Sequence, residues 1–283
     1  MSNNHLQQPT PKVAHHRVQE LLSPSSSPET KAHIARWYGE MIIELFLSDA
    51  AKSRVGSQVF KKLPLEDKIK EIKKDFGKDI IDTLWIIKDF GDKASHYNDE
   101  YQPSESEASE IVKKAINLFT LILIDHLKNE GLEKTFNRAT IFSILFPSVR
   151  EMVLYELVNF NDLSNDLNLG LLHKYVLACV KNGGRNKIRR RLASLYKNKK
   201  IDAFFYEYEI KSIDAIESGI VNNELPVAKT IGDCKRNFID VMQKIEESEL
   251  LENERLIKII DTLLDQVEPT DMGDYESMKV YVV

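Results

Sequence analysis

Apolar residues recur every three or four positions through most of this chain, and this spacing limits the fold more than any other feature. The stretch from Ile34 to Phe46 is one example, and the stretch from Ile111 to Leu127 is another. Such spacing places apolar side chains on one face of an α-helix, whereas a half-buried strand alternates apolar and polar residues. No alternating run is present, and no unit of 20 to 50 residues repeats. The sequence therefore predicts an all-α protein.

Local signals predict where several helices begin and end. Ser and Thr favour the N-cap, Pro the first helical position and Gly the residue after the last turn. Helices are predicted to begin at Ser27-Pro28-Glu29, Pro64, the capping-box pattern Ser104 to Glu107, and Pro147, and to end at Gly77 and Gly183-Gly184. Residues 278–283 are β-prone but lack a recognisable second strand.

The length of 283 residues allows two ordinary domains. We expect a flexible arm over residues 1–27, a helical bundle over 28–132 and a second helical domain with a basic segment over 133–283. The N-terminal stretch lacks the apolar segment of a leader, and the longest apolar run, Leu118 to Ile124, is too short to span a membrane. With only two cysteines and a net charge of −5, the composition favours a cytoplasmic protein that binds no membrane, metal or cofactor.

One stretch, residues 80–99, combines helical apolar spacing with chemically versatile side chains. Lys88, Asp92, Lys93 and His96 fall on adjoining turns of the predicted helix over residues 78–97. Imidazole titrates near neutral pH, and a lysine can offset charge on a phosphate. The cluster is thus a candidate for phosphate binding or proton transfer. A structural interpretation is also open, in which Asp92 pairs with His96 and Gly91 permits close helix packing.

Residues 27–130 resemble the HEPN superfamily, in particular the uncharacterised bacterial branch associated with restriction and defence proteins. The resemblance rests on the order of the helices and on Arg36 and Glu40 in an early helix, followed by Lys88, Gly91, Asp92 and His96 in a later one. It implies a helical bundle that forms a homodimer with the two copies of the motif facing each other.

Active members of this superfamily cleave RNA without a metal ion, and the resemblance implies the same chemistry for an active site in this chain. His96 would be the general acid or base, Asp92 would orient its imidazole, and Lys88 or Lys93 would offset charge on the phosphate. Gly91 stands where active members carry an Arg, and Lys cannot supply the planar fork of a guanidinium. Whether the chain is an enzyme therefore stays open.

A strongly basic segment lies in the second half of the chain. Its cations could bind the phosphates of RNA or DNA, or they could pair with acidic neighbours such as Glu207 and Glu209. The aromatic cluster Phe204, Phe205, Tyr206 and Tyr208 is predicted to be core rather than a stacking platform. The basic residues are Arg185, Lys187, Arg189, Arg190, Arg191, Lys197, Lys199 and Lys200.

Three functional hypotheses follow. The leading one is a non-catalytic or weakly catalytic HEPN-like component of a bacterial or mobile-element defence system, which binds nucleic acid or a partner protein of that system. The second is a metal-independent endoribonuclease toxin that uses His96. The third is a protein-interaction adaptor without enzymatic activity.

Overall fold

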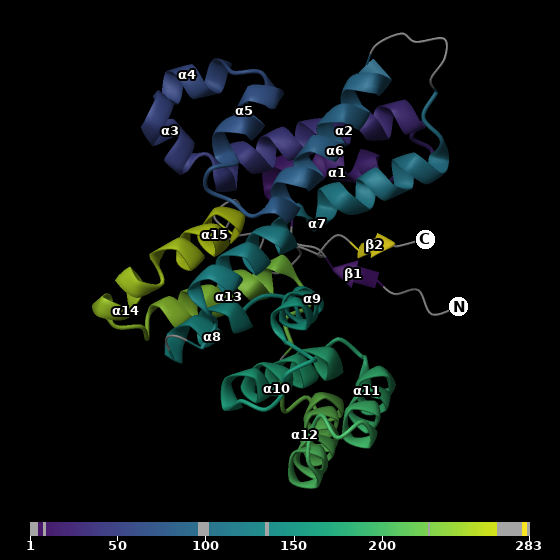
Figure 1. The fold of residues 1–283 in the computed structure, drawn as a ribbon, viewed down its shortest axis with the longest axis vertical. Helices are drawn as coiled ribbons and strands as arrows, with labels where there is room; N and C mark the ends of the chain where they lie inside the picture. Colours follow the sequence, from purple (N-terminus) through teal and green to yellow (C-terminus); the bar gives the residue numbers. More distant parts are fainter. Residues whose placement is uncertain are drawn as a thin grey trace. The chain divides into compact units, whose positions relative to one another are not determined.

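The computed structural model describes residues 5–7, 10–95, 102–133, 136–225, 227–264 and 279–281. The fold is all-α, as predicted, apart from two strands of three residues (Figure 1). The chain forms two compact units. The first contains the described residues up to Asp125, together with the part of α15 from Lys258 onward and strand β2, and the second contains His126–Ile257.

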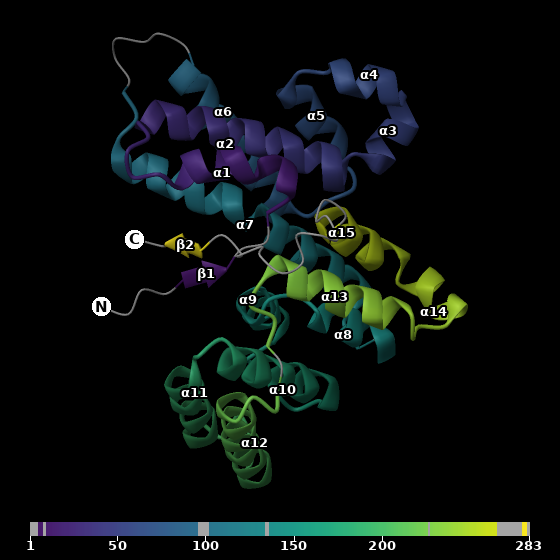
Figure 2. The same cartoon turned by 180° about the vertical axis from the view of Figure 1, so that it is seen from behind.

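The first unit is built mainly from helices that pack around α2 (Figure 2). Its elements are β1 (His5–Gln7), η1 (Lys12–Ala14), α1 (His15–Leu22), α2 (Pro28–Ile42), the π-helical turn η2 (Ile43–Leu47), α3 (Asp49–Val55), α4 (Ser57–Lys62), α5 (Leu65–Ile72), α6 (Lys78–Ser95), most of α7 (Glu105–Glu130), the end of α15 (Glu254–Leu264) and β2 (Lys279–Tyr281).

Two features lie within the segment that the sequence predicts to be an arm. The first is helix α1, whose Val18 and Leu21 are fully buried. The second is strand β1, which pairs with β2 in antiparallel register so that Leu6 lies opposite Val280. The β-prone end of the chain therefore has a partner strand. Sequence inspection missed it because three residues are too few for a period-two pattern to be visible.

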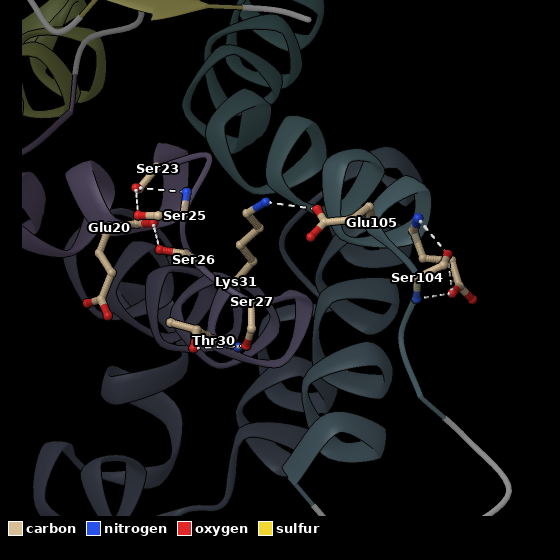
Figure 3. Close-up of polar contacts among 10 residues, drawn as sticks. Glu20, Ser23, Ser25, Ser26, Ser27, Thr30, Lys31, Ser104 and Glu105 are labelled. Carbon is tan, nitrogen blue, oxygen red and sulfur yellow. Dashed lines mark hydrogen bonds and ion pairs between the residues drawn. The ribbon is translucent and has the colours of Figure 1, made fainter.

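The predicted N-caps of two helices in the first unit are confirmed. The Thr30 N–H donates to Ser27 Oγ at 3.3 Å at the start of α2. At the start of α7 the Ser104 N–H donates to Glu107 Oε2 at 2.9 Å, and the Glu107 N–H donates to Ser104 Oγ at 3.2 Å, which completes the capping box. Between the two caps Lys31 Nζ of α2 donates to Glu105 Oε2 of α7 at 3.0 Å (Figure 3).

The second unit contains two packed groups of helices. In one group α8 (Phe136–Ser143) contacts α13 (Ile231–Met242), and α14 (Glu247–Glu252) follows. In the other, α9 (Pro147–Leu157), α10 (Asp166–Lys181), α11 (Arg185–Lys197) and α12 (Ala203–Val221) pack on one another (Figure 1). Pro147 takes the first turn of α9, as predicted, and Gly183 follows α10 with a φ of +80°.

The sequence places a domain boundary between residues 132 and 133, whereas the chain leaves the first compact unit inside α7 and returns to it inside α15. Helix α7 keeps its helical apolar spacing along its whole length, so no change of pattern marks the point where the units divide.

Candidate functional sites

The candidate cluster on α6 is held by ion pairs. Asp92 lies between two cations, with Oδ1 at 3.0 Å from Arg36 Nε of α2 and Oδ2 at 3.0 Å from Lys88 Nζ. Lys88 Nζ also lies 3.3 Å from Asp89 Oδ1 and 3.6 Å from Glu66 Oε2 of α5. The structure thus brings together Lys88 and Asp92 of the predicted cluster and adds Arg36, which the prediction had not placed in the cluster.

The ion pairs neutralise the positive charge of Lys88 that would otherwise attract a phosphate. The hydrogen bond to Asp92, followed by that to Asp89, raises the pKa of Lys88 above its ordinary value, so the ammonium stays charged at neutral pH. With three carboxylates near it, Lys88 presents little net positive charge to a substrate. Lys93 is exposed on the same helix, and His96 lies outside the described residues, so the four predicted catalytic residues are described only in part.

At Gly91, helix α6 packs closely against Arg36 of α2. A Cβ atom placed on Gly91 would lie 2.7 Å from Arg36 Cβ and 2.8 Å from Arg36 Cδ. Only a residue without a side chain fits at this distance, which confirms the structural interpretation that Gly91 permits close helix packing. Glu40, the other residue of the resemblance on α2, pairs with Lys68 Nζ of α5 at 2.8 Å.

Helix α11 and the residues that follow it carry the basic segment, and three of its eight cations contact acidic side chains. Arg185 and Arg189 pair with Asp214 of α12, and Arg185 also pairs with Glu217. Lys187 Nζ lies 2.7 Å from Glu151 Oε1 of α9. Acidic neighbours were expected, but Glu207 and Glu209 are not the partners of these cations. Glu207 is exposed, and Glu209 is buried elsewhere on α12.

Two more of the basic residues are engaged without a carboxylate. The Arg191 guanidinium lies 3.8 Å from the centre of the Phe160 ring and 4.9 Å from that of Tyr155, in cation–π geometry. Lys200 Nζ donates to the Asn161 carbonyl at 2.8 Å. These two cations therefore support the fold of the loop between α9 and α10.

The remaining basic residues, Arg190, Lys197 and Lys199, are exposed. None of them has an ion pair or a side-chain hydrogen bond within the described parts of the chain. We call them the open cations. They leave uncompensated positive charge on α11 and at the turn after it.

One open cation, Lys199, lines a hollow in the surface. The hollow measures about 700 Å³, and its wall also includes Tyr196 of α11, Phe205 of α12 and the acidic residues Asp162 and Asp202. Tyr196 is 44% exposed and stacks on Tyr206, with the ring centres 4.9 Å apart and the planes at 11°. The site thus joins positive charge to accessible aromatic rings.

The prediction that the aromatic cluster at the start of α12 is core was wrong. Phe204 is 82% exposed, Tyr208 is 51% exposed, and Phe205 and Tyr206 are only partly buried. The helix turns its buried face, with Glu209 and Ile213, toward its neighbours and leaves these rings at the surface. The spacing of aromatic residues alone did not distinguish the two faces.

A buried histidine–carboxylate pair was not visible in the sequence. His173 Nδ1 of α10 lies 2.8 Å from Glu209 Oε1 of α12, and Glu209 is fully buried. The ring of Tyr208 lies 5.6 Å from that of His173. The two residues are 36 positions apart on different helices, so no local motif connects them. We interpret the pair as structural, because a buried carboxylate requires a partner.

Comparison with family models, curated proteins and solved structures finds no match to this chain. No helix within the described ranges has the length and hydropathy that a membrane span requires. Across the same residues, no three His, Cys, Asp or Glu side chains converge on a position for a metal ion.

Proposed function

We propose that this protein is a non-catalytic, HEPN-like component of a bacterial or mobile-element defence system, and that its second unit binds single-stranded RNA. The observation that carries the proposal is the open cation Lys199 in the wall of a hollow that is also lined by Tyr196 and Phe205. Two further open cations, Arg190 and Lys197, are exposed on helix α11. Exposed cations attract the phosphates of a strand, and aromatic rings stack on its unpaired bases. A duplex would bind less well, because its bases are already stacked.

The α6 cluster supports the non-catalytic part of the proposal. Lys88 and Asp92 are already engaged with each other and with neighbouring charges. Gly91, which stands where active members of the superfamily carry an Arg, is held in a helix contact that leaves no space for a side chain. Arginine at this position would require α2 and α6 to move apart.

One observation favours the endoribonuclease as a second candidate. Arg36 brings a guanidinium from α2 to within 3.0 Å of Asp92, one turn before His96 in the sequence. A guanidinium on a neighbouring helix could take the role of the missing Arg in binding a phosphate. Activity would then depend on both Arg36 and His96.

Binding is tested by fluorescence anisotropy with a labelled oligouridylate of about 12 nucleotides, titrated at several salt concentrations. Three phosphate contacts predict a slope of log affinity against log salt of about −2. The same strand annealed to its complement should bind more weakly. Absence of binding at low salt, or equal affinity for the duplex, would exclude the proposed mode of recognition.

Catalysis is tested separately by incubating total RNA with the protein in EDTA. We expect intact RNA with the wild-type chain. Cleavage that disappears in both His96→Ala and Arg36→Ala would instead establish the second candidate. Cleavage that persists in both variants would indicate a contaminating nuclease.

A further inference from the structure

Two cations of the second unit are partly buried without a counter-ion. Arg150 lies on α9 and Lys181 ends α10, and these two helices pack directly on each other. The Arg150 Nε is shielded from solvent and has no hydrogen-bond partner. Neither side chain has an ion pair or a side-chain hydrogen bond with any of the described residues. This arrangement is unusual, because buried charges in proteins are nearly always paired.

The pKa shifts of Arg150 and Lys181 agree with the absence of a counter-ion. Burial lowers the pKa of Arg150 to about 10. Burial, and then the nearby charge of Arg150, lowers the pKa of Lys181. The geometry places the two cations at the same end of the contact between α9 and α10, because Asn182, the residue after Lys181, donates from Nδ2 to Oε2 of Glu151, the residue after Arg150, at 2.7 Å.

The adjacent side chains of α13 do not supply a negative charge. Burial raises the pKa of the Cys234 thiol to about 12, so it is neutral at physiological pH. The Asp233 carboxylate caps α13, accepting hydrogen bonds from the N–H groups of Lys229 and Thr230, and it also pairs with Arg236. Both positions on α13 are therefore excluded as partners of Arg150.

We propose that Arg150 and Lys181 form a binding site for a phosphate dianion, either inorganic phosphate or a phosphate monoester. A guanidinium offers a planar pair of N–H donors to two phosphate oxygens, and an ammonium adds a compact charge to a third. The dianion would compensate both buried cations at once. The site involves none of the open cations and does not depend on the proposed RNA binding.

The test compares thermal unfolding in inorganic phosphate and in chloride at equal ionic strength and pH. At a phosphate concentration about 100 times the dissociation constant, the midpoint of the wild-type protein should rise by roughly 5 °C. Lys181→Met and Arg150→Met should each remove most of this rise. In chloride, Lys181→Met should unfold at a higher temperature than the wild type, because it removes an unpaired buried charge.

Lys174→Met is the matched control, because Lys174 lies on the same helix but is paired with Glu133 at 3.4 Å. This variant should keep the full phosphate response. Lys199→Gln, at the hollow, should keep it too, and calorimetric titration should give phosphoserine a similar affinity and an oligouridylate none at this site. No response in the wild type, an equal response in Lys181→Met, or a response lost in Lys199→Gln would overturn the proposal.

Discussion

Lys199 adopts a left-handed backbone conformation, with a φ of 56°, in the turn that ends α11. Its N–H donates to the Tyr196 carbonyl and the Lys200 N–H donates to the Leu195 carbonyl, which together form a Schellman motif. Glycine is the usual residue at this position, and another residue costs about 1 kcal/mol there. A lysine retained under this strain, at the wall of the hollow, is consistent with a role in binding.

Lys199→Gly should therefore separate stability from function. The free energy of unfolding, from urea titration, should rise by about 1 kcal/mol, while RNA affinity falls because one open cation is lost. Asn223→Gly is the control, since Asn223 is also left-handed, with a φ of 57°, at the end of α12. Asn223→Gly should raise the free energy of unfolding by less, because Asn tolerates this conformation, and it should leave RNA affinity unchanged. A Lys199→Gly variant with wild-type affinity would remove Lys199 from the site.

A second residue, His126 of α7, is predicted to make the second unit less stable in acid. It is 3% exposed, and neither ring nitrogen has a hydrogen-bond partner among the described residues. Burial, followed by the charges of Arg255 and Arg138, lowers its pKa to about 4. Between pH 6.5 and 4 the unfolded chain takes up a proton that the folded chain does not, so stability falls as the pH falls through this window.

The loss due to His126 should reach about 3 kcal/mol at pH 4. His126→Phe, which keeps an aromatic ring but cannot be protonated, should remove this part of the loss in urea titrations at pH 7, 5.5 and 4.5. His16→Phe, at an exposed position, should follow the wild-type curve. Equal acid sensitivity in His126→Phe and in the wild type would contradict the assignment.

At the scale of the helix, the contact between α2 and α6 depends on the absence of a side chain at Gly91. Gly91→Ala would gain up to about 1 kcal/mol of helix propensity, but the clash with Arg36 should cost about 1–3 kcal/mol. We expect net destabilisation. Gly170→Ala in α10 is the matched control, because a Cβ there meets nothing within 4 Å. This substitution should raise the free energy of unfolding. Measured free energies of unfolding that move in the same direction for both variants would contradict the close packing at Gly91.

Helix α11 shows why a basic run is a weak indicator by itself. Some of its cations are paired and others are open, because Arg185 and Arg189 face Asp214 of α12 while Arg190 is exposed. The run could be read from the sequence. The partners could not, since Asp214, Glu217 and Glu151 come from other helices, and Glu207 lies on the exposed side of α12.

Across the whole molecule, several helix starts were predictable and tertiary partners were not. One predicted helix end was wrong, because α5 ends at Ile72 and not at Gly77. The caps at Ser27 and Ser104 and the start of α9 at Pro147 depend on neighbouring residues, so the sequence located them correctly. The pairing of β1 with β2, the division of α7 between two units and the exposure of Phe204 depend on residues far away in the chain. The relation to the HEPN superfamily stays a prediction.

The most direct test of RNA binding is a comparison of two triple variants by anisotropy with the labelled oligouridylate. One variant changes the open cations Arg190, Lys197 and Lys199 to Gln. The other changes Lys61, Lys62 and Lys73 of the first unit, which are also exposed and lack a partner among the described residues, so the net charge changes equally.

The account predicts that the first variant loses affinity by on the order of 100-fold at low salt and that its salt slope becomes shallower by about 2, whereas the second variant binds almost as well as the wild type. Equal losses in the two variants would show that overall charge, and not the site at the end of α11, governs binding.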